Sequence, residues 1–199
     1  MPQMPTIRLA LETDATAIRA IYAPIVRETH ISFEQAVPGT DEIAARIQTT
    51  LAQYPWLVCE LGGQLAGYAY ASAFRSRAAY QWTTETTVYV HSDFQRRGIA
   101  RALYTSLLAL LQAQGYVTAV GVIALPNPAS IHLHEALGFS KVGVFRNVGH
   151  KAGNWRATGW WQLDLRPPPT APEAPAPLPT LAQESRFPAL LAASLPYIR

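Results

Sequence analysis

A strand that leads through a basic loop directly into a helix is the feature that most constrains this chain. The segment is TTVYVHSDFQRRGIARALY, residues 86–104. β-Branched and aromatic residues predict the strand, and apolar residues at helical spacing predict a helix that ends at Gly115. The amides that open a helix have no partner inside it, so a glycine and arginines beside them favour a phosphate site. A plain basic turn has the same residues, so the local pattern leaves both interpretations open.

Hydrophobic patterning along the rest of the chain predicts an α/β domain. Gly62 and Gly63, between two apolar runs, mark a β-hairpin. The predicted order of elements is β-α-α-β-β-β-α-β-α-β-β, within residues 1–166. Residues 167–199 contain nine of the 16 prolines and few charges, so we expect an extended, polyproline-like tail that is an appendage to the domain. The apolar stretch 187–195 within this tail is also able to dock on the domain as a short helix or strap.

Composition and charge exclude several classes of protein. The chain has 199 residues and one cysteine, which fits a single cytoplasmic domain with neither a disulfide framework nor a cysteine-based zinc site. We expect no signal peptide, no membrane span and no metal. Residues 71–166 hold four acidic and ten basic side chains, and most of the basic ones are arginines. Arginine suits phosphate or carboxylate on small ligands, and a nucleic-acid binder usually has a larger, lysine-rich excess.

Two ordered motifs then carry a family resemblance. QRRGIA (95–100) and NPASIHLHEALGF (127–139) resemble the two motifs of the GCN5-related N-acetyltransferase (GNAT) superfamily, and the resemblance covers about residues 5–166. It implies the GNAT fold, a mixed, mostly antiparallel sheet flanked by helices. Within the superfamily, FRSRAAYQWTTETTVYV, HEALGF and GNWRATGWWQLDL are similar to the phosphinothricin and methionine sulfoximine/sulfone N-acetyltransferases. That branch acetylates the α-amine of small amino-acid analogues.

The resemblance implies acetyl-CoA as co-substrate and places its binding residues. A main-chain N–H of Val88 or Tyr89 is expected to stabilise the oxyanion, and Val90 to pair with the pantetheine arm. The amide of Asn127 is expected to contact the cofactor, although Asn before Pro is also an ordinary helix cap. The residues expected to hold the pyrophosphate are Gln95, Arg96, Arg97, Gly98, Ile99, Ala100 and Arg101.

Two side chains are the candidate catalytic groups. The family places its general-base glutamate at the T-x-E position of Glu85, where burial would raise the carboxyl pKa. The spacing alone favours a solvated glutamate on a sheet face, and the motif context reverses that preference. His134 stands where many relatives have a tyrosine that protonates the departing thiolate. A histidine can protonate the thiolate or relay a proton, or it can be a structural residue bonded to the backbone. With no cysteine in the motifs, direct transfer in a ternary complex is expected.

The sequence motifs say less about the residues that bind the amine substrate than about those that bind acetyl-CoA. Arg75 and Arg77 can clamp a substrate carboxylate or be solvated loop charges. Aromatic residues can wall the substrate pocket or belong to the core; these are Phe33, Tyr80, Trp82 and Trp155. The family forms homodimers, and the strand WRATGWWQLDL, with Trp160 and Trp161 facing opposite ways, suits such an interface. The alternatives are an acetyltransferase for protein N-termini or other amines, and a non-catalytic acyl-CoA-binding or nucleic-acid-binding module.

Overall fold

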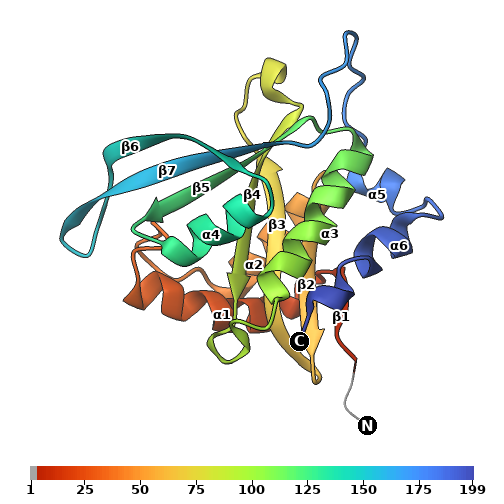
Figure 1. Ribbon diagram of the computed structural model, residues 1–199. Coiled ribbons are helices and arrows are strands. Elements are labelled where there is room, and N and C mark those ends of the chain that lie inside the picture. Colours follow the sequence, from red (N-terminus) through yellow and green to blue (C-terminus); the bar gives the residue numbers. More distant parts are fainter. Residues whose placement is uncertain (1–3) are drawn as a thin grey trace.

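The computed structural model describes residues 4–199 and contains one seven-stranded sheet (Figure 1). Its strand order is β1-β2-β3-β4-β5-β7-β6, and only β4 and β5 pair in parallel. The α/β fold predicted from the sequence is therefore confirmed. The strands are β1 (Thr6–Leu9), β2 (Trp56–Leu61), β3 (Gln64–Ala73), β4 (Thr83–Val90), β5 (Thr118–Leu125), β6 (Ser140–Lys151) and β7 (Asn154–Asp164).

Helices cover both faces of the sheet. The helices α1 (Ala15–Glu28) and α2 (Thr40–Leu51) pack on one face, and α3 (Ile99–Gln114) and α4 (Pro128–Ala136) pack on the other. Alternation along β2 shows why: Trp56 and Val58 join the cluster under α1 and α2, while Leu57 and Cys59 join the cluster under α3. Gly115, in the left-handed region at φ 101°, ends α3 as predicted.

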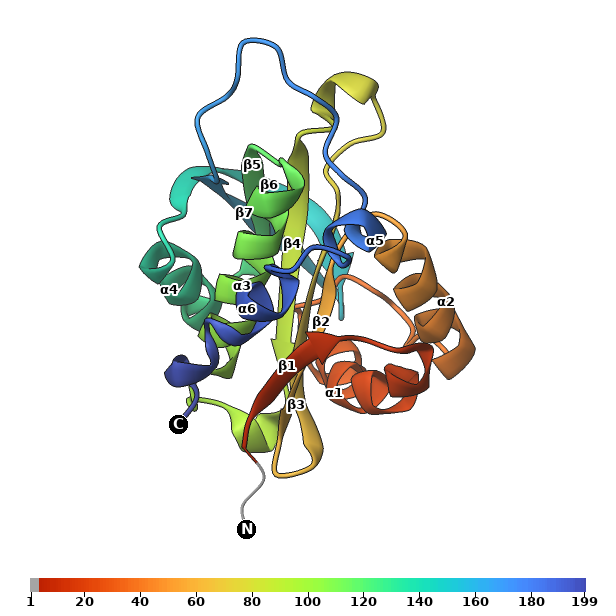
Figure 2. The same cartoon turned by 90° about the vertical axis from the view of Figure 1, so that its right-hand side faces the viewer.

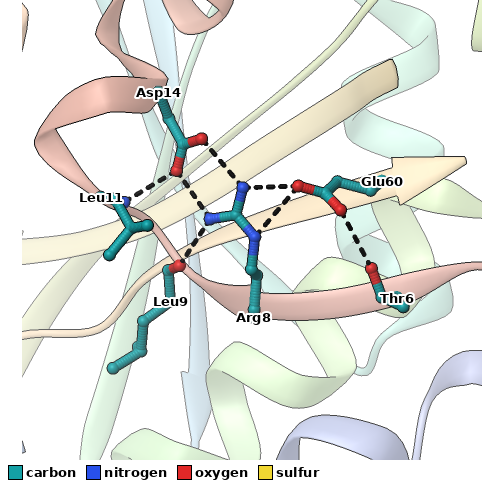
Figure 3. Close-up of polar contacts among 6 residues, drawn as sticks. All are labelled: Thr6, Arg8, Leu9, Leu11, Asp14 and Glu60. Carbon is teal, nitrogen blue, oxygen red and sulfur yellow. Dashed lines mark hydrogen bonds and ion pairs between the residues drawn. The ribbon is translucent and has the colours of Figure 1, made fainter. Parts of the chain in front are cut away.

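A partly exposed ion-pair network joins β1 to β2 and to the residues that precede α1 (Figure 3). The Arg8 guanidinium donates to the Asp14 carboxylate, with Nη1 to Oδ2 at 2.7 Å, and also to Glu60 on β2. The Leu11 main-chain N–H donates to the same Asp14 carboxylate. Burial acts to raise the pKa of Asp14, but these hydrogen bonds hold it below its ordinary value. One arginine thus joins the first strand, the second strand and the start of α1.

The proline-rich segment folds back along α3, beside which it lies in Figure 2. It contains α5 (Leu178–Leu181), α6 (Phe187–Ala192) and a short 3₁₀ turn, η4 (Leu195–Tyr197). Leu178, Leu181 and Phe187 are buried in the same cluster as the inner face of α3. An extended appendage is therefore not what the structure shows, because apolar residues between the prolines bury against the domain. The apolar stretch 187–195 forms α6 and the residues that follow it.

Candidate functional site

A cleft opens where β4 and β5 separate. These strands pair only from Thr83 to Thr86 and from Thr118 to Gly121; beyond that point β4 pairs with β3 alone and β5 with β7 alone. Every second residue at the end of β4 therefore turns its N–H and C=O toward a gap, not toward a neighbouring strand. The cleft has a volume of about 1190 Å³, enough for an extended ligand.

The cleft brings together most of the residues that the sequence singled out. Side chains and backbone from α1, the following loop, β4, α3 and α4 all line it. Arg75, Arg77, Arg97 and Tyr80 are not among the lining residues. The predicted residues that line it are Phe33, Glu85, Val88, Tyr89, Val90, Gln95, Arg96, Gly98, Ile99, Ala100, Arg101, Asn127 and His134.

The basic loop forms the end of the cleft at the start of α3. Arg96 and Gly98 both have left-handed backbone, at φ 62° and 82°, and Gly98 is the N-cap of the helix. Among residues 4–199, no main-chain acceptor bonds the amides of the first helical turn, Ile99 to Arg101. Free amides, the positive end of the helix dipole and exposed arginines together fit a diphosphate.

Glu85 lies on β4, beside the point where the two strands separate. Its carboxyl is half-buried and lines the cleft. Burial raises the pKa of Glu85, and the positive charge of Arg75 opposes part of that rise. A carboxylate in this state is a stronger base than an exposed one and is able to accept a proton from an ammonium group in the cleft. Arg75 itself is exposed, with its guanidinium 4.5 Å from the centre of the Phe74 ring.

His134 is buried in the wall between α3, α4 and β5. Its Nδ1 lies 2.8 Å from the main-chain oxygen of Ser130, and its Nε2 lies 3.2 Å from the hydroxyl of Tyr104. A carbonyl oxygen only accepts, so Nδ1 carries the proton and Nε2 of the neutral ring accepts from Tyr104. Burial lowers the pKa of His134, and the bond to Ser130 opposes this. The ring is therefore a neutral hydrogen-bond partner of Tyr104 at pH 7.

The remaining aromatic candidates occupy different places. Tyr80 packs edge-on against Phe74, at 5.7 Å between ring centres. The Trp82 indole donates to the carbonyl of Glu173 in the C-terminal segment, and Trp155 is largely exposed on β7. Trp161 is buried and donates to Glu135 on α4, whereas Trp160 faces the other side of the sheet, next to Phe145. The predicted opposite orientation of the two tryptophans is thus observed, and it takes Trp161 out of any interface.

Several cleft residues were not anticipated from the sequence. Ser32 and Tyr70 line the cleft, and Tyr104 joins it from α3. Burial raises the pKa of Tyr70 and of Tyr104, so both phenols stay protonated at neutral pH. Helical spacing places Tyr104 one turn from Arg101, on the helix that follows the basic loop, and this spacing was the only signal in the sequence. Tyr197, near the C-terminus, also lines the cleft and gave no signal at all.

Two kinds of feature are missing from residues 4–199. No group of three or more histidine, cysteine, aspartate or glutamate side chains lies close enough together to hold a metal ion. No helix in this range combines the length and the apolar character needed to cross a membrane.

Comparisons with known proteins agree with this geometry. The family profile described as "Acetyltransferase (GNAT) domain" matches residues 7–160. The chain is 40% identical over 170 residues to phosphinothricin N-acetyltransferase of Streptomyces viridochromogenes, across 85% of this chain and 93% of that protein. It is 35% identical over 161 residues to the L-methionine sulfoximine/L-methionine sulfone acetyltransferase of Salmonella typhimurium, across 80% of this chain and 94% of that protein. A Salmonella typhimurium acetyltransferase solved with acetyl-CoA superimposes with a TM-score of 0.81 and 35% identity, across 86% of this chain and 99% of that one.

Proposed function

Because this chain belongs to the acetyltransferase (GNAT) family and is an acetyl-CoA-dependent N-acetyltransferase, we propose that it acetylates the α-amine of a small amino-acid analogue. The substrate class is that of phosphinothricin, methionine sulfoximine and methionine sulfone, on which the two similar proteins act by name. The observation that carries the proposal is the cleft between β4 and β5, with Glu85 beside it and the basic loop at its end. We assign the catalytic domain to residues 1–166 and treat 167–199 as an accessory segment.

The residues of the cleft fit acetyl-CoA. The amides from Gln95 to Arg101 and the side chains of Arg96 and Arg101 would hold its pyrophosphate, while Arg97 lies in the same loop but does not line the cleft. Val90 would pair with the pantetheine arm at the open edge of β4. A main-chain N–H of Val88 or Tyr89 would donate to the oxyanion, and Asn127 at the start of α4 would contact the cofactor. Acetyl-CoA supplies the thioester that the amine attacks.

Direct transfer is supported by the state of the only cysteine. Cys59 is buried on β2 and does not line the cleft. Burial raises the pKa of its thiol to about 12, so almost no thiolate exists at neutral pH to accept an acetyl group. In this proposal the amine attacks the thioester directly, and Glu85 accepts the proton that the ammonium group loses before the attack.

His134 contributes through Tyr104 in this proposal. The ring fixes the phenol by accepting its hydrogen bond, and the one hydroxyl proton of Tyr104 would have to turn from Nε2 of His134 to the sulfur for the pair to protonate the departing thiolate. If the pair assists departure of the thiolate, Tyr104→Phe and His134→Ala both lower kcat and alter its pH profile. A purely structural pair would give a lower melting temperature for His134→Ala and an unchanged kcat for Tyr104→Phe.

Arg75 and Arg77 remain the proposed carboxylate clamp, with Arg75 the better supported. The positive charge of Arg75 acts to lower the pKa of Glu85, so a substrate carboxylate bound to Arg75 would place the α-amine near the base. Phe33 would contact the substrate side chain from within the cleft, and Tyr80 would support the clamp by packing on Phe74. Arg75→Ala should raise KM for the amine much more than KM for acetyl-CoA.

The test is a thiol-release assay with acetyl-CoA and each of the three amino-acid analogues, with an N-terminal peptide as a fourth acceptor. Turnover of at least one analogue, well above turnover of the peptide, is expected. Acetylation of the peptide alone would replace the proposed substrate class by protein N-termini. Absence of CoA release with all four acceptors would reject both.

We further propose a homodimer formed through β6 and β7, which extend away from the body of the molecule (Figure 1). Large apolar side chains are exposed there: Val142 is 65%, Phe145 56%, Val148 54% and Trp155 65% exposed. Such a group on one hairpin is unusual for a monomer and is typical of an interface. Sedimentation equilibrium should give twice the chain mass, and Phe145→Asp should shift it toward the monomer.

A further inference from the structure

The C-terminal segment runs along α3 from the end of the helix to its beginning. Gln114, in the last turn of α3, makes two hydrogen bonds with Ala176: its main-chain oxygen accepts from the Ala176 N–H, and its side-chain amide donates to the Ala176 oxygen. Halfway along, the buried hydroxyl of Ser106 lies 2.6 Å from that of Ser194 and donates to the oxygen of Leu191. Leu195 and Ile198 then pack against the main core cluster. The segment is fixed at several points, so its last residues have a defined place.

That place is the basic loop of the cofactor cleft. The main-chain N–H of Arg199 donates to the oxygen of Arg97 at 2.9 Å. The Tyr197 carbonyl lies so close to Gly98 that a Cβ there would overlap it. The Arg101 guanidinium lies over the Tyr197 ring, 4.4 Å from its centre. Three separate contacts thus join the last three residues of the chain to the loop expected to hold pyrophosphate.

The same residues also line the cleft. Pro196, Tyr197 and Arg199 belong to the wall that contains Arg96, Gly98 and Arg101. Arg199 therefore brings a third cation to this end, beside Arg96 and Arg101, and all three are exposed. Coenzyme A has a pyrophosphate and a ribose phosphate at its nucleotide end, so it offers more anionic groups than two arginines would match. The contacts leave the first-turn amides of α3 free for the ligand.

We propose that residues 195–199 form part of the cofactor site: Arg199 binds a phosphate of acetyl-CoA, and Tyr197 and the Arg199 amide hold the loop 96–101 in its binding conformation. This inference rests on the proposed use of acetyl-CoA by this cleft. The loop needs such support because Arg96 adopts a left-handed backbone, at φ 62°, that a side chain disfavours. A loop held in place before binding loses less entropy when the ligand arrives, so affinity rises.

The segment is an addition to the part of the chain that the comparisons match. The family profile ends at residue 160, and the Salmonella structure with acetyl-CoA is covered over 99% of its length by 86% of this chain. The proposed contacts would therefore be specific to chains that have this extension. They would adjust cofactor affinity without changing the groups that carry out the acetyl transfer.

The experiment compares CoA binding by isothermal titration calorimetry in the full chain and in a chain that ends at Pro196. Removal of 197–199 should weaken CoA binding about tenfold, because one main-chain hydrogen bond, one cation–π contact and one phosphate contact are lost. Arg199→Ala should weaken it about two- to fivefold. Arg186→Ala is the matched control, since it removes the same charge from an exposed site near α6 that does not line the cleft, and CoA affinity should not change.

A second acyl donor separates the two ends of the cofactor. Acetyl-pantetheine lacks the nucleotide phosphates, so its KM should be the same in the truncated and the full chain. Circular dichroism melting confirms that the truncated chain is folded, and Arg199→Ala tests the idea without truncation. Equal CoA affinity in all variants, or tighter binding after truncation, would overturn the inference alone. Failure of the full chain to bind CoA would overturn the proposed function as well.

Discussion

Leu181→Ala tests whether the C-terminal segment is part of the folded core. Leu181 lies in α5 and is completely buried, in the same apolar cluster as Leu107 and Leu110 of α3. The substitution removes three buried carbon groups, and at about 0.8 kcal/mol each the lost transfer free energy is about 2.4 kcal/mol. The cavity that remains adds to this, so we expect the free energy of unfolding to fall by about 3–4 kcal/mol.

Differential scanning calorimetry measures the effect directly. For a domain of this size each kcal/mol lowers the melting temperature by about 2–4 °C, so a decrease of at least about 6 °C is expected. Leu11→Ala is the matched control, because Leu11 is 57% exposed and the same substitution there should change stability by less than about 0.5 kcal/mol. An unchanged melting temperature for Leu181→Ala would refute the conclusion that α5 is packed against α3.

Three further predictions concern single side chains. Glu85→Gln should lower kcat by about 10²-fold or more with little change in KM for acetyl-CoA. In the wild type the pKa of Glu85 is raised, so kcat/KM should increase with pH up to a point above the ordinary carboxyl range, and a pH–rate profile measures this. Gly121→Ala should cost about 1–3 kcal/mol in chemical denaturation, because a Cβ there would lie 2.5 Å from the His134 ring, while Gly143→Ala, with nothing within 4 Å, should cost far less. The pKa of Asp14 is lowered in the folded state, so the contribution of this carboxylate to stability is complete above its unfolded pKa of about 3.9 and is lost as pH falls through the folded pKa. Asp14→Asn should therefore lose less stability in acid than the wild type. Urea denaturation across that pH range measures the difference.

The elements that the sequence predicted well are those set by local patterns. The strand, basic loop and helix from residue 83 to 115 depend on β-branched residues, helical spacing and a terminal glycine, all within one short segment. Gly62 and Gly63 likewise adopt positive φ, 61° and 78°, and turn β2 into β3 as the pair of glycines indicates. No contact with a distant part of the chain is needed to recognise either feature.

The features that the sequence did not predict depend on distant contacts. Proline content suggested an extended tail, but Leu178 and Leu181 find an apolar face on α3 that is more than 60 residues away in the chain. The pattern around His134 leaves its environment open, because its burial is created by Gly121 on β5, which has no side chain to keep the ring away. Alternation required Trp160 and Trp161 to face opposite ways, yet only the position of α4 decides which one is buried.

In the proposed site, helix α3 would connect the stability of the fold to the binding of the cofactor, and the C-terminal segment contacts this helix at both ends. At one end α5 contributes buried leucines and no residue that lines the cleft. At the other end Tyr197 and Arg199 are exposed but line the cleft. Loss of a buried leucine acts on the free energy of unfolding, and loss of the exposed Arg199 side chain acts on the ligand-bound state. Leu181→Ala should therefore lower the melting temperature with little change in CoA affinity, and Arg199→Ala should weaken CoA binding with little change in the melting temperature. If both changes altered stability and affinity in proportion, the segment would act only as a stabiliser of α3, with no direct part in binding.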